Sequence, residues 1–128
     1  MDILPSEKNK LFFAKQNESL ANFLGRTGTK LGSSENKFGL ITVSQGALRC
    51  CDFKRELVPD NKKLSKKNVP IVKLFGKHLK IDEQVAWLTK KDKIPVAIST
   101  IDRLDKLFAK QAIDINKVDT ILLDWNYG

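Results

Sequence analysis

The 128-residue sequence has no long apolar run. Its longest ones, such as Gly39 to Val43 and Thr120 to Leu123, fall far below the roughly 20 residues that a membrane-spanning helix requires. The first residues include Pro5, Glu7 and two lysines before any apolar cluster, and this does not resemble a secretory signal. We therefore expect a protein that stays inside the cell and does not associate with a membrane.

Cysteine is scarce, and Cys50 and Cys51 are the only two in the chain. Adjacent cysteines cannot adopt ordinary disulfide geometry with each other without severe strain, which suits a reducing compartment. A redox or metal pair is the alternative, but two thiols without matching Cys or His ligands elsewhere make a poor zinc site. We expect both to be small side chains on a helix, with no metal bound.

A phosphate-binding loop is also missing. The chain has no G-x-x-x-x-G-K-[ST] sequence, the pattern in which backbone N–H groups and a lysine surround nucleotide phosphates. Gly28-Thr29-Lys30 and Gly76-Lys77-His78 resemble parts of it, but their order and spacing are wrong, so we expect loops there. His78 is the only histidine and no G-x-S-x-G sequence accompanies it, which argues against nucleophilic catalysis. We expect no catalytic residue and no cofactor.

Positive charge is what the sequence has in excess. It contains 23 Lys and Arg against 15 Asp and Glu, a formal charge of +8. Such a balance attracts polyanions through phosphate neutralisation and counterion release, so nucleic acid is the leading class of partner. The alternative is that the lysines only solvate the surface. Residues 59–67, which hold four of them, are expected to form an exposed basic loop.

The spacing of apolar residues predicts one N-terminal helix followed by alternating strands and helices. Ser6 to Leu24 predicts an amphipathic helix or a broken pair that stops at Gly25. Short apolar runs predict four strands, at Gly39 to Val43, Pro70 to Phe75, Pro95 to Ser99 and Asp119 to Asp124. The helices between them are expected at Gln45 to Val58, at Asp82 to Lys91 with Val85, Ala86 and Leu88 facing inward, and through Ile101, Leu104, Leu107 and Phe108.

This alternation predicts an α/β fold. Strands and helices of these lengths require parallel pairing with right-handed crossovers, which gives a central parallel sheet covered by helices. Ligands in such sheets bind beyond the carboxyl ends of the strands. We expect residues 1–38 to form an N-terminal helix and loop that pack on an α/β domain of residues 39–128.

Three segments resemble the first domain of DEAD-box helicases. Val43-Ser44 through Leu57 takes the place of the P-T-R-E-L segment, Ser99 to Arg103 that of T-P-G-R, and Leu122 to Tyr127 that of the D-E-A-D strand end. A closer similarity is to the Cms-type family of helicase-like subunits of the early small-subunit pre-ribosome. It includes Val43 to Arg49, Leu123 to Tyr127 and, most specifically, Lys73 to Val85.

The resemblance implies a degenerate, three-layer RecA-like (P-loop-NTPase-like) domain that lacks the phosphate-binding loop, a pseudo-helicase without ATPase activity. An active helicase has a glutamate where this chain has Trp125. Asp124 could face a metal, but without a phosphate loop the metal has nothing to bridge. The resemblance also implies a nuclear and nucleolar protein of ribosome biogenesis and rRNA processing in the small-subunit processome. Its partners would be pre-ribosomal RNA, small nucleolar RNA and other pre-ribosome proteins, and it would be monomeric outside the particle.

Candidate contact residues follow from the basic face of such a domain. The candidate RNA-binding residues are Arg49, Lys77, Lys80, Thr100 and Arg103. Trp125 and Tyr127 stand at the mouth of the last strand, where aromatic faces could dock a partner or simply cap the sheet. In the T-P-G-R-like segment the glycine turn is replaced, and the acidic Asp102 would repel a phosphate.

Three functions fit these observations. We expect a non-catalytic binding protein of ribosome biogenesis. A purely protein-docking scaffold is one alternative, and a fragment of a DEAD-box-like RNA helicase or another α/β enzyme is the other. Members of the family that the chain resembles continue past the position of Gly128 with a basic helical segment, so a fragment, a reduced homologue and an incomplete gene model are all compatible with the sequence.

Overall fold

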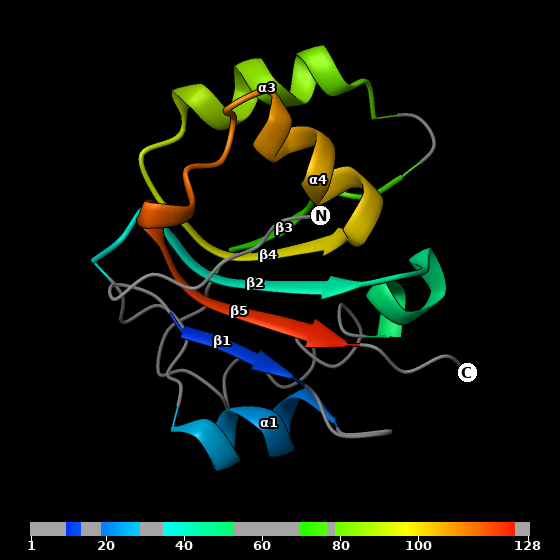
Figure 1. Ribbon diagram of the computed structural model, residues 1–128, viewed down its shortest axis with the longest axis vertical. Helices are drawn as coiled ribbons and strands as arrows, with labels where there is room; N and C mark the ends of the chain where they lie inside the picture. Colours follow the sequence, from blue (N-terminus) through cyan, green and yellow to red (C-terminus); the bar gives the residue numbers. More distant parts are fainter. Residues whose placement is uncertain (1–9, 14–18, 29–34, 53–69, 77–78, 125–128) are drawn as a thin grey trace.

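The structure, a computed structural model, describes residues 10–13, 19–28, 35–52, 70–76 and 79–124. A five-stranded sheet of order β1-β5-β2-β4-β3 forms its centre (Figure 1), and every pairing in it is parallel. The strands are β1 (Lys10–Phe13), β2 (Phe38–Ser44), β3 (Ile71–Lys73), β4 (Ile94–Thr100) and β5 (Val118–Asp124). The predicted α/β fold with a parallel sheet is confirmed.

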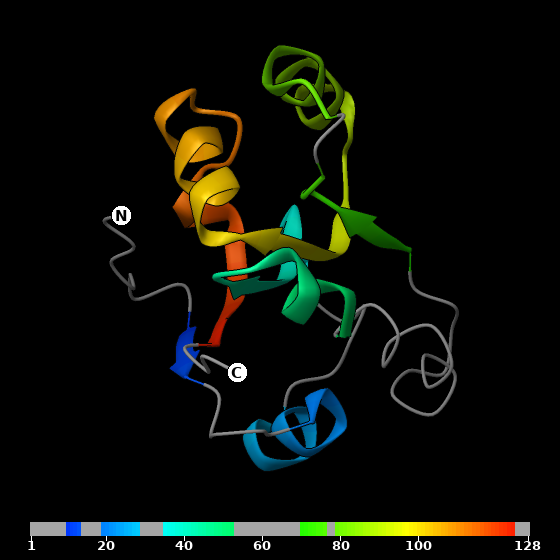
Figure 2. The ribbon, with the colours of Figure 1, turned by 90° about the vertical axis from the view of Figure 1, so that its right-hand side faces the viewer.

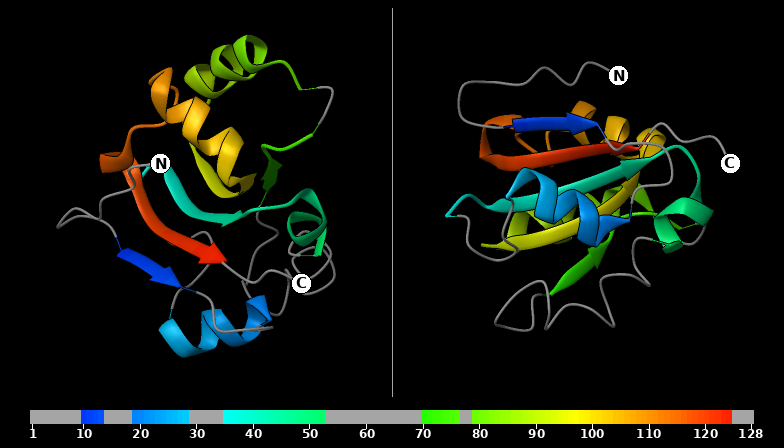
Figure 3. Two further views of the ribbon diagram at one scale, coloured as in Figure 1. Left: turned by 45° about the vertical axis from the view of Figure 1, so that its right-hand side comes forward. Right: turned by 90° about the horizontal axis from the view of Figure 1, so that it is seen from below.

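Helices cover both faces of this sheet, so the molecule has three layers (Figure 2). On one face lie α3 (Ile81–Lys90) and α4 (Ile101–Ala109), and a 3-10 turn, η1 (Ile115–Lys117), leads into β5. On the other face lie α1 (Leu20–Thr27), which crosses the sheet in the right-hand view of Figure 3, and the helical residues 47–52. The arrangement is that of a three-layer RecA-like domain.

The strands read as continuous apolar runs because both of their faces are covered. In β4, Ala97 packs in the core under α3 and α4, whereas Val96 and Ile98 pack in the core under α1. In β5, Ile121 joins the first core and Leu122 the second. This two-sided burial explains why β2, β4 and β5 could be recognised from short apolar runs alone.

Residues 10–13 correct the prediction of a helix from Ser6 to Leu24. They form β1, whose Leu11 pairs with Ile121 of β5. Leu11 packs against the core under α3 and α4, and Phe12 against the opposite core, which is the two-residue period of a strand. A run this short does not distinguish a strand from a helix by spacing.

Two details of the predicted helices are also wrong. The helix expected to stop at Gly25 continues through it and ends at Gly28, whose φ of 72° only glycine adopts without cost. Ala86, expected on the inner face of its helix, is exposed, because Gln84 and Leu88 occupy that face one turn apart. The division of the chain into residues 1–38 and 39–128 stays a prediction.

Several predicted features lie outside the described residues. They are the helix beyond residue 52, the basic segment 59–67, Thr29, Lys30, Lys77, His78, Trp125 and Tyr127. Among the helices that are described, none combines the length and the apolar character that crossing a membrane requires.

Candidate nucleic-acid interface

The carboxyl ends of the three central strands meet at one edge of the sheet. Ser44 at the end of β2 pairs with Thr100 of β4 on one side and with Asp124 of β5 on the other. After β2 the chain passes to the face covered by α1, where Cys50 packs, and after β4 it passes to the opposite face, where α4 packs. Open α/β sheets bind ligands at such a switch point, because neighbouring connections separate there.

We call this region the carboxyl edge and define it by the residues at the switch point and the side chains that reach them. They are Ser44, Arg49, Thr100, Arg103 and Asp124. Three of the five predicted RNA contacts therefore lie at one edge of the sheet. In Figure 1 the edge is the side to which the arrowheads of the strands point.

Asp124 and Arg49 form a buried ion pair at this edge. Nε of Arg49 lies 2.5 Å from Oδ2 of Asp124, whose side chain is 0% exposed, against 22% for Arg49. A buried carboxylate requires such a charge-assisted hydrogen bond, because its desolvation is otherwise very costly. Arg49, expected to contact phosphate, is thus placed against an internal anion that offsets its charge.

Thr100 and Arg103 are placed by the start of α4. The Thr100 hydroxyl accepts a hydrogen bond from the backbone N–H of Arg103 at 3.3 Å and so caps the helix. Nη1 of Arg103 donates to Oε1 of Gln84 on α3 at 3.2 Å, and Nε2 of Gln84 donates to the carbonyl of Leu74 at 3.2 Å. A guanidinium has five N–H donors, so the bond to Gln84 orients Arg103 and engages only one of them.

Two charged side chains modify the electrostatics around Arg103. Asp102, expected to repel a phosphate, is exposed and pairs with Nζ of Lys106 at 3.3 Å, one turn along α4. Lys80 is exposed at the N-cap of α3, and its carbonyl accepts the backbone N–H of Gln84 at 3.0 Å. Lys80 therefore lies one turn from the glutamine that holds Arg103, on the same side of the sheet.

Cys50 has the character of a core residue. Burial raises the pKa of its thiol to about 12, and the neighbouring Cys51 and Asp124 add to the rise. Its Sγ donates to the carbonyl of Ser99 at 3.3 Å. Because nucleophilic attack and metal binding need the thiolate, this protonated thiol has a packing role, as its expected place on a helix implied.

Two features of the carboxyl edge were not predicted from the sequence. The pairing of Arg49 with Asp124 joins residues 75 positions apart, and no local spacing could have indicated it. Gln84 did leave a signal, since it is a polar residue on the buried face of α3 between Ile81 and Leu88. Among the described residues, no group of three or more His, Cys, Asp or Glu side chains could hold a metal ion.

Comparison with known proteins gives a family and several relatives. The family described as "CMS1: U3-containing 90S pre-ribosomal complex subunit" matches residues 8–128. Protein CMS1 of Chaetomium thermophilum is 33% identical over 113 residues, which are 84% of this chain and 43% of the relative. Protein CMSS1 of Danio rerio is 33% identical over 88 residues, 69% of this chain and 28% of the relative.

A third relative, protein cms1 of Schizosaccharomyces pombe, is 30% identical over 88 residues, 69% of this chain and 30% of the relative. The chain thus spans less than half the length of each of these relatives.

Proposed function

The chain belongs to the CMS1 family of U3-containing 90S pre-ribosomal complex subunits, and on this premise we propose that it is a non-catalytic ribosome-biogenesis factor of early small-subunit pre-ribosomal particles. It acts in the nucleus and nucleolus, where it associates with pre-ribosomal RNA, small nucleolar RNA and other pre-ribosome proteins. The family match over residues 8–128 is the observation that carries the proposal.

The state of Asp124 supports the non-catalytic part of the proposal. In a helicase-like site a carboxylate at this strand end would hold a metal ion against nucleotide phosphates. Here the carboxylate is buried and Arg49 occupies Oδ2 at 2.5 Å. The three-layer fold supports the proposed helicase-like ancestry. We infer that the ion pair between Arg49 and Asp124 replaced the metal site.

Nucleotide titration tests this part directly. We expect calorimetry with ATP and Mg²⁺ to show no saturable heat for the wild-type chain. The same titration is made with the Arg49→Ala variant, in which the Asp124 carboxylate loses its ion pair with Arg49, once circular dichroism has shown that the variant is folded. Saturable binding of ATP by the wild type would contradict a non-catalytic role.

RNA contact at the carboxyl edge is the second part of the proposal. Arg103 and Thr100 are the described candidates at the edge, Lys80 is a candidate beside it at the N-cap of α3, and Arg103 is held in position by Gln84. Phosphate contacts release counterions, so we expect the affinity for single-stranded RNA to fall as salt rises. Arg103→Ala should lower the affinity and reduce the slope of log K against log salt by about 1.

The matched control for this titration is Lys117→Ala. Lys117 is exposed but precedes β5, at the opposite edge of the sheet. The substitution removes one positive charge without altering the carboxyl edge. An equal effect of both substitutions, or an affinity that does not depend on salt, would contradict the assigned contacts.

A protein-docking scaffold is the second candidate. It is favoured by the ion pair of Arg49 with Asp124, which offsets one of the positive charges that RNA would need. Its test is charge reversal of the lysines in residues 59–67 in cells. Unchanged recruitment to the pre-ribosome would favour the scaffold, and loss of recruitment would favour RNA contact.

A further inference from the structure

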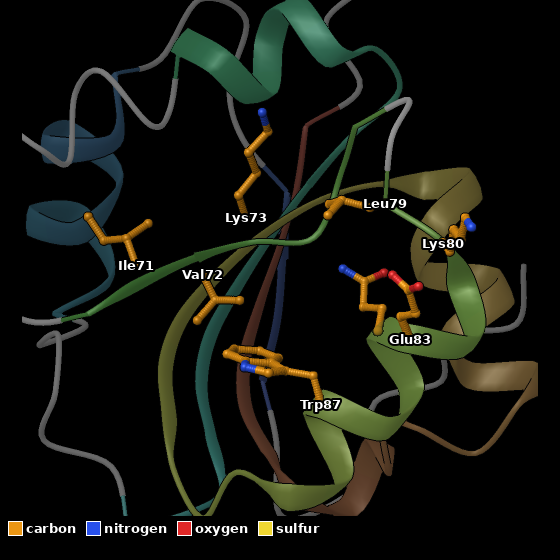
Figure 4. Close-up of a pocket in the computed structure, with 8 residues that line it drawn as sticks. Ile71, Val72, Lys73, Leu79, Lys80, Glu83 and Trp87 are labelled. Carbon is orange, nitrogen blue, oxygen red and sulfur yellow. The ribbon is translucent and has the colours of Figure 1, made fainter.

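A groove with a volume of about 520 Å³ lies between β3 and α3, away from the strand ends of β2 and β5 (Figure 4). Ile71, Val72, Leu79 and Trp87 supply its apolar lining, and Lys73 and Lys80 supply charge. In Figure 4, Val72 points toward the ring of Trp87 across the groove, and Lys73 points the other way from the strand.

The groove follows the edge of the sheet. β3 is the last strand in the sheet order, and its partner is β4. All three of its residues line the groove, although successive side chains of a strand point to opposite faces. Val72 packs toward the core under α3 and α4, and Ile71 toward the core under α1. The side chain of Val72 thus faces the groove, and Ile71 and Lys73 border it from the same strand.

The backbone of β3 is oriented for pairing at this edge. The N–H of Leu74 donates to the carbonyl of Ile98 in β4 at 2.8 Å. In a parallel strand, successive residues direct their N–H and C=O groups to alternate sides. Val72 therefore faces β4 like Leu74, and the N–H and C=O of Lys73 and Ile71 are directed to the outer edge.

The lining favours an aliphatic side chain over a nucleic-acid base. Trp87 and Leu79 are large apolar side chains that are 40% and 38% exposed, and burying them on binding is favourable. Nζ of Lys91 lies 5.2 Å from the centre of the Trp87 ring. That cation occupies one of the two ring faces on which a base can stack.

The charge around the groove selects an acidic partner. Lys73 and Lys80 line it, Lys91 covers Trp87, and Glu83 is the acidic residue in the lining. Two lysines against one glutamate give the lining a net positive charge that attracts carboxylates, and complementary charge contributes specificity and association rate.

We propose that the groove binds an extended, acidic segment of a partner protein that adds as a strand beside β3, with an apolar side chain between Leu79 and Trp87 and carboxylates beside Lys73 and Lys80. Strand addition supplies affinity through backbone hydrogen bonds, and side-chain pockets supply specificity. The groove adjoins the carboxyl edge, because Lys80 and Gln84 belong to its lining, but the proposal does not rest on RNA contact there.

Synthetic peptides test the proposal. The probes are a labelled ten-residue peptide that alternates Asp with Val, the same peptide with Lys in place of Asp, and a ten-nucleotide oligouridylate. Fluorescence anisotropy should show saturable binding of the Asp peptide, with an affinity at least tenfold higher than that of the Lys peptide. Hydrogen exchange should show that binding protects the backbone N–H of Lys73.

Two variants locate the binding, and one serves as a control. Trp87→Ala and the exposed Lys80→Glu should each lower the affinity for the Asp peptide at least tenfold, and the second does not disturb packing. Leu48→Ala removes an apolar side chain that is 85% exposed on the helical residues 47–52 and should change nothing.

Three outcomes would overturn the proposal. They are equal binding of the Asp and Lys peptides, unchanged affinity in both groove variants, and displacement of the Asp peptide by oligouridylate. The last outcome would identify the groove as an RNA site instead.

Discussion

Asp124 is the residue on which the account of the carboxyl edge depends, because its buried carboxylate is paired with Arg49 at 2.5 Å. Breaking a buried pair by removing one partner leaves an uncompensated charge in the interior. We expect Arg49→Ala to lower the free energy of unfolding by about 3–5 kcal/mol, measured by urea denaturation.

The control for this prediction is Lys106→Ala, which removes an exposed pair with Asp102. Exposed pairs contribute little, so its effect should stay within about 1 kcal/mol. Similar small losses for both variants would mean that the pair with Arg49 does not stabilise the fold.

Cys50 makes the stability of the fold depend on pH in the alkaline range. Burial raises the pKa of its thiol from 9.0 to about 12, so the folded state binds this proton more tightly than the unfolded state does. The resulting stability is fully present below pH 9 and is lost as pH rises toward 12. We expect the free energy of unfolding of the wild type to fall more steeply in this window than that of Cys50→Ala, as measured by urea denaturation.

Cys51→Ala is the matched control, because Cys51 is only half-buried, and it should retain the steep fall. Parallel curves for wild type and Cys50→Ala between pH 9 and 12 would contradict this prediction.

At the scale of residues, the sequence allowed only part of the edge to be predicted. Thr100 and Arg103 could be proposed because they directly follow an apolar strand, and the carboxyl ends of parallel strands share an edge. The pairing of Arg49 with Asp124 could not, because it depends on how two distant strands and a helix meet. The groove was missed because it forms only when α3, with Trp87, packs beside β3, with Val72.

At the scale of elements, β2 and β4 approach each other at Gly39. A Cβ at this position would lie 2.5 Å from the carbonyl oxygen of Pro95, so the backbones would have to separate. We expect Gly39→Ala to destabilise the fold by about 1–3 kcal/mol, the usual cost of overpacking, in thermal and urea unfolding.

Gly25→Ala is the opposite case. Gly25 lies within α1, and a Cβ there meets nothing within 4 Å. Alanine should stabilise the helix by about 0.5–1 kcal/mol. A change of stability in the same direction for both substitutions would contradict the close contact of β2 and β4 at Gly39.

The packing of α1 against β1 rests on two aromatic rings. Phe23 is 1% exposed, and its ring meets that of Phe12 edge-on at 5.7 Å between centroids. Phe23→Ala should cost about 3–5 kcal/mol, as for other buried Phe residues. Phe13→Ala, at a neighbouring position that is 56% exposed, should stay within about 0.5 kcal/mol.

If urea denaturation showed equal effects of the two substitutions, residues 10–13 would not form the strand described.

β1 is also the element that the sequence predicted least well. The central strands were predictable because both faces are buried and turn-forming residues bound them. β1 was not, because four residues beside a helix have too little periodicity to separate the two states.

At the scale of the whole molecule, the three-layer fold carries two adjoining surfaces. The carboxyl edge holds Arg103 and Thr100 beside an internally neutralised Asp124, and the groove at β3 combines apolar side chains with lysines. A formal charge of +8 favours anionic partners at both. The proposed assignment is RNA at the first surface and an acidic protein segment at the second.

UV crosslinking of the tagged protein in cells, followed by sequencing of the attached RNA, tests the central proposal most directly. A protein that contacts RNA in the early pre-ribosome should give reads concentrated on the small-subunit ribosomal RNA precursor and on its guide small nucleolar RNA, and Arg103→Ala should reduce them. Background reads from a protein that still co-sediments with the pre-ribosome would contradict RNA contact and assign the carboxyl edge to protein docking.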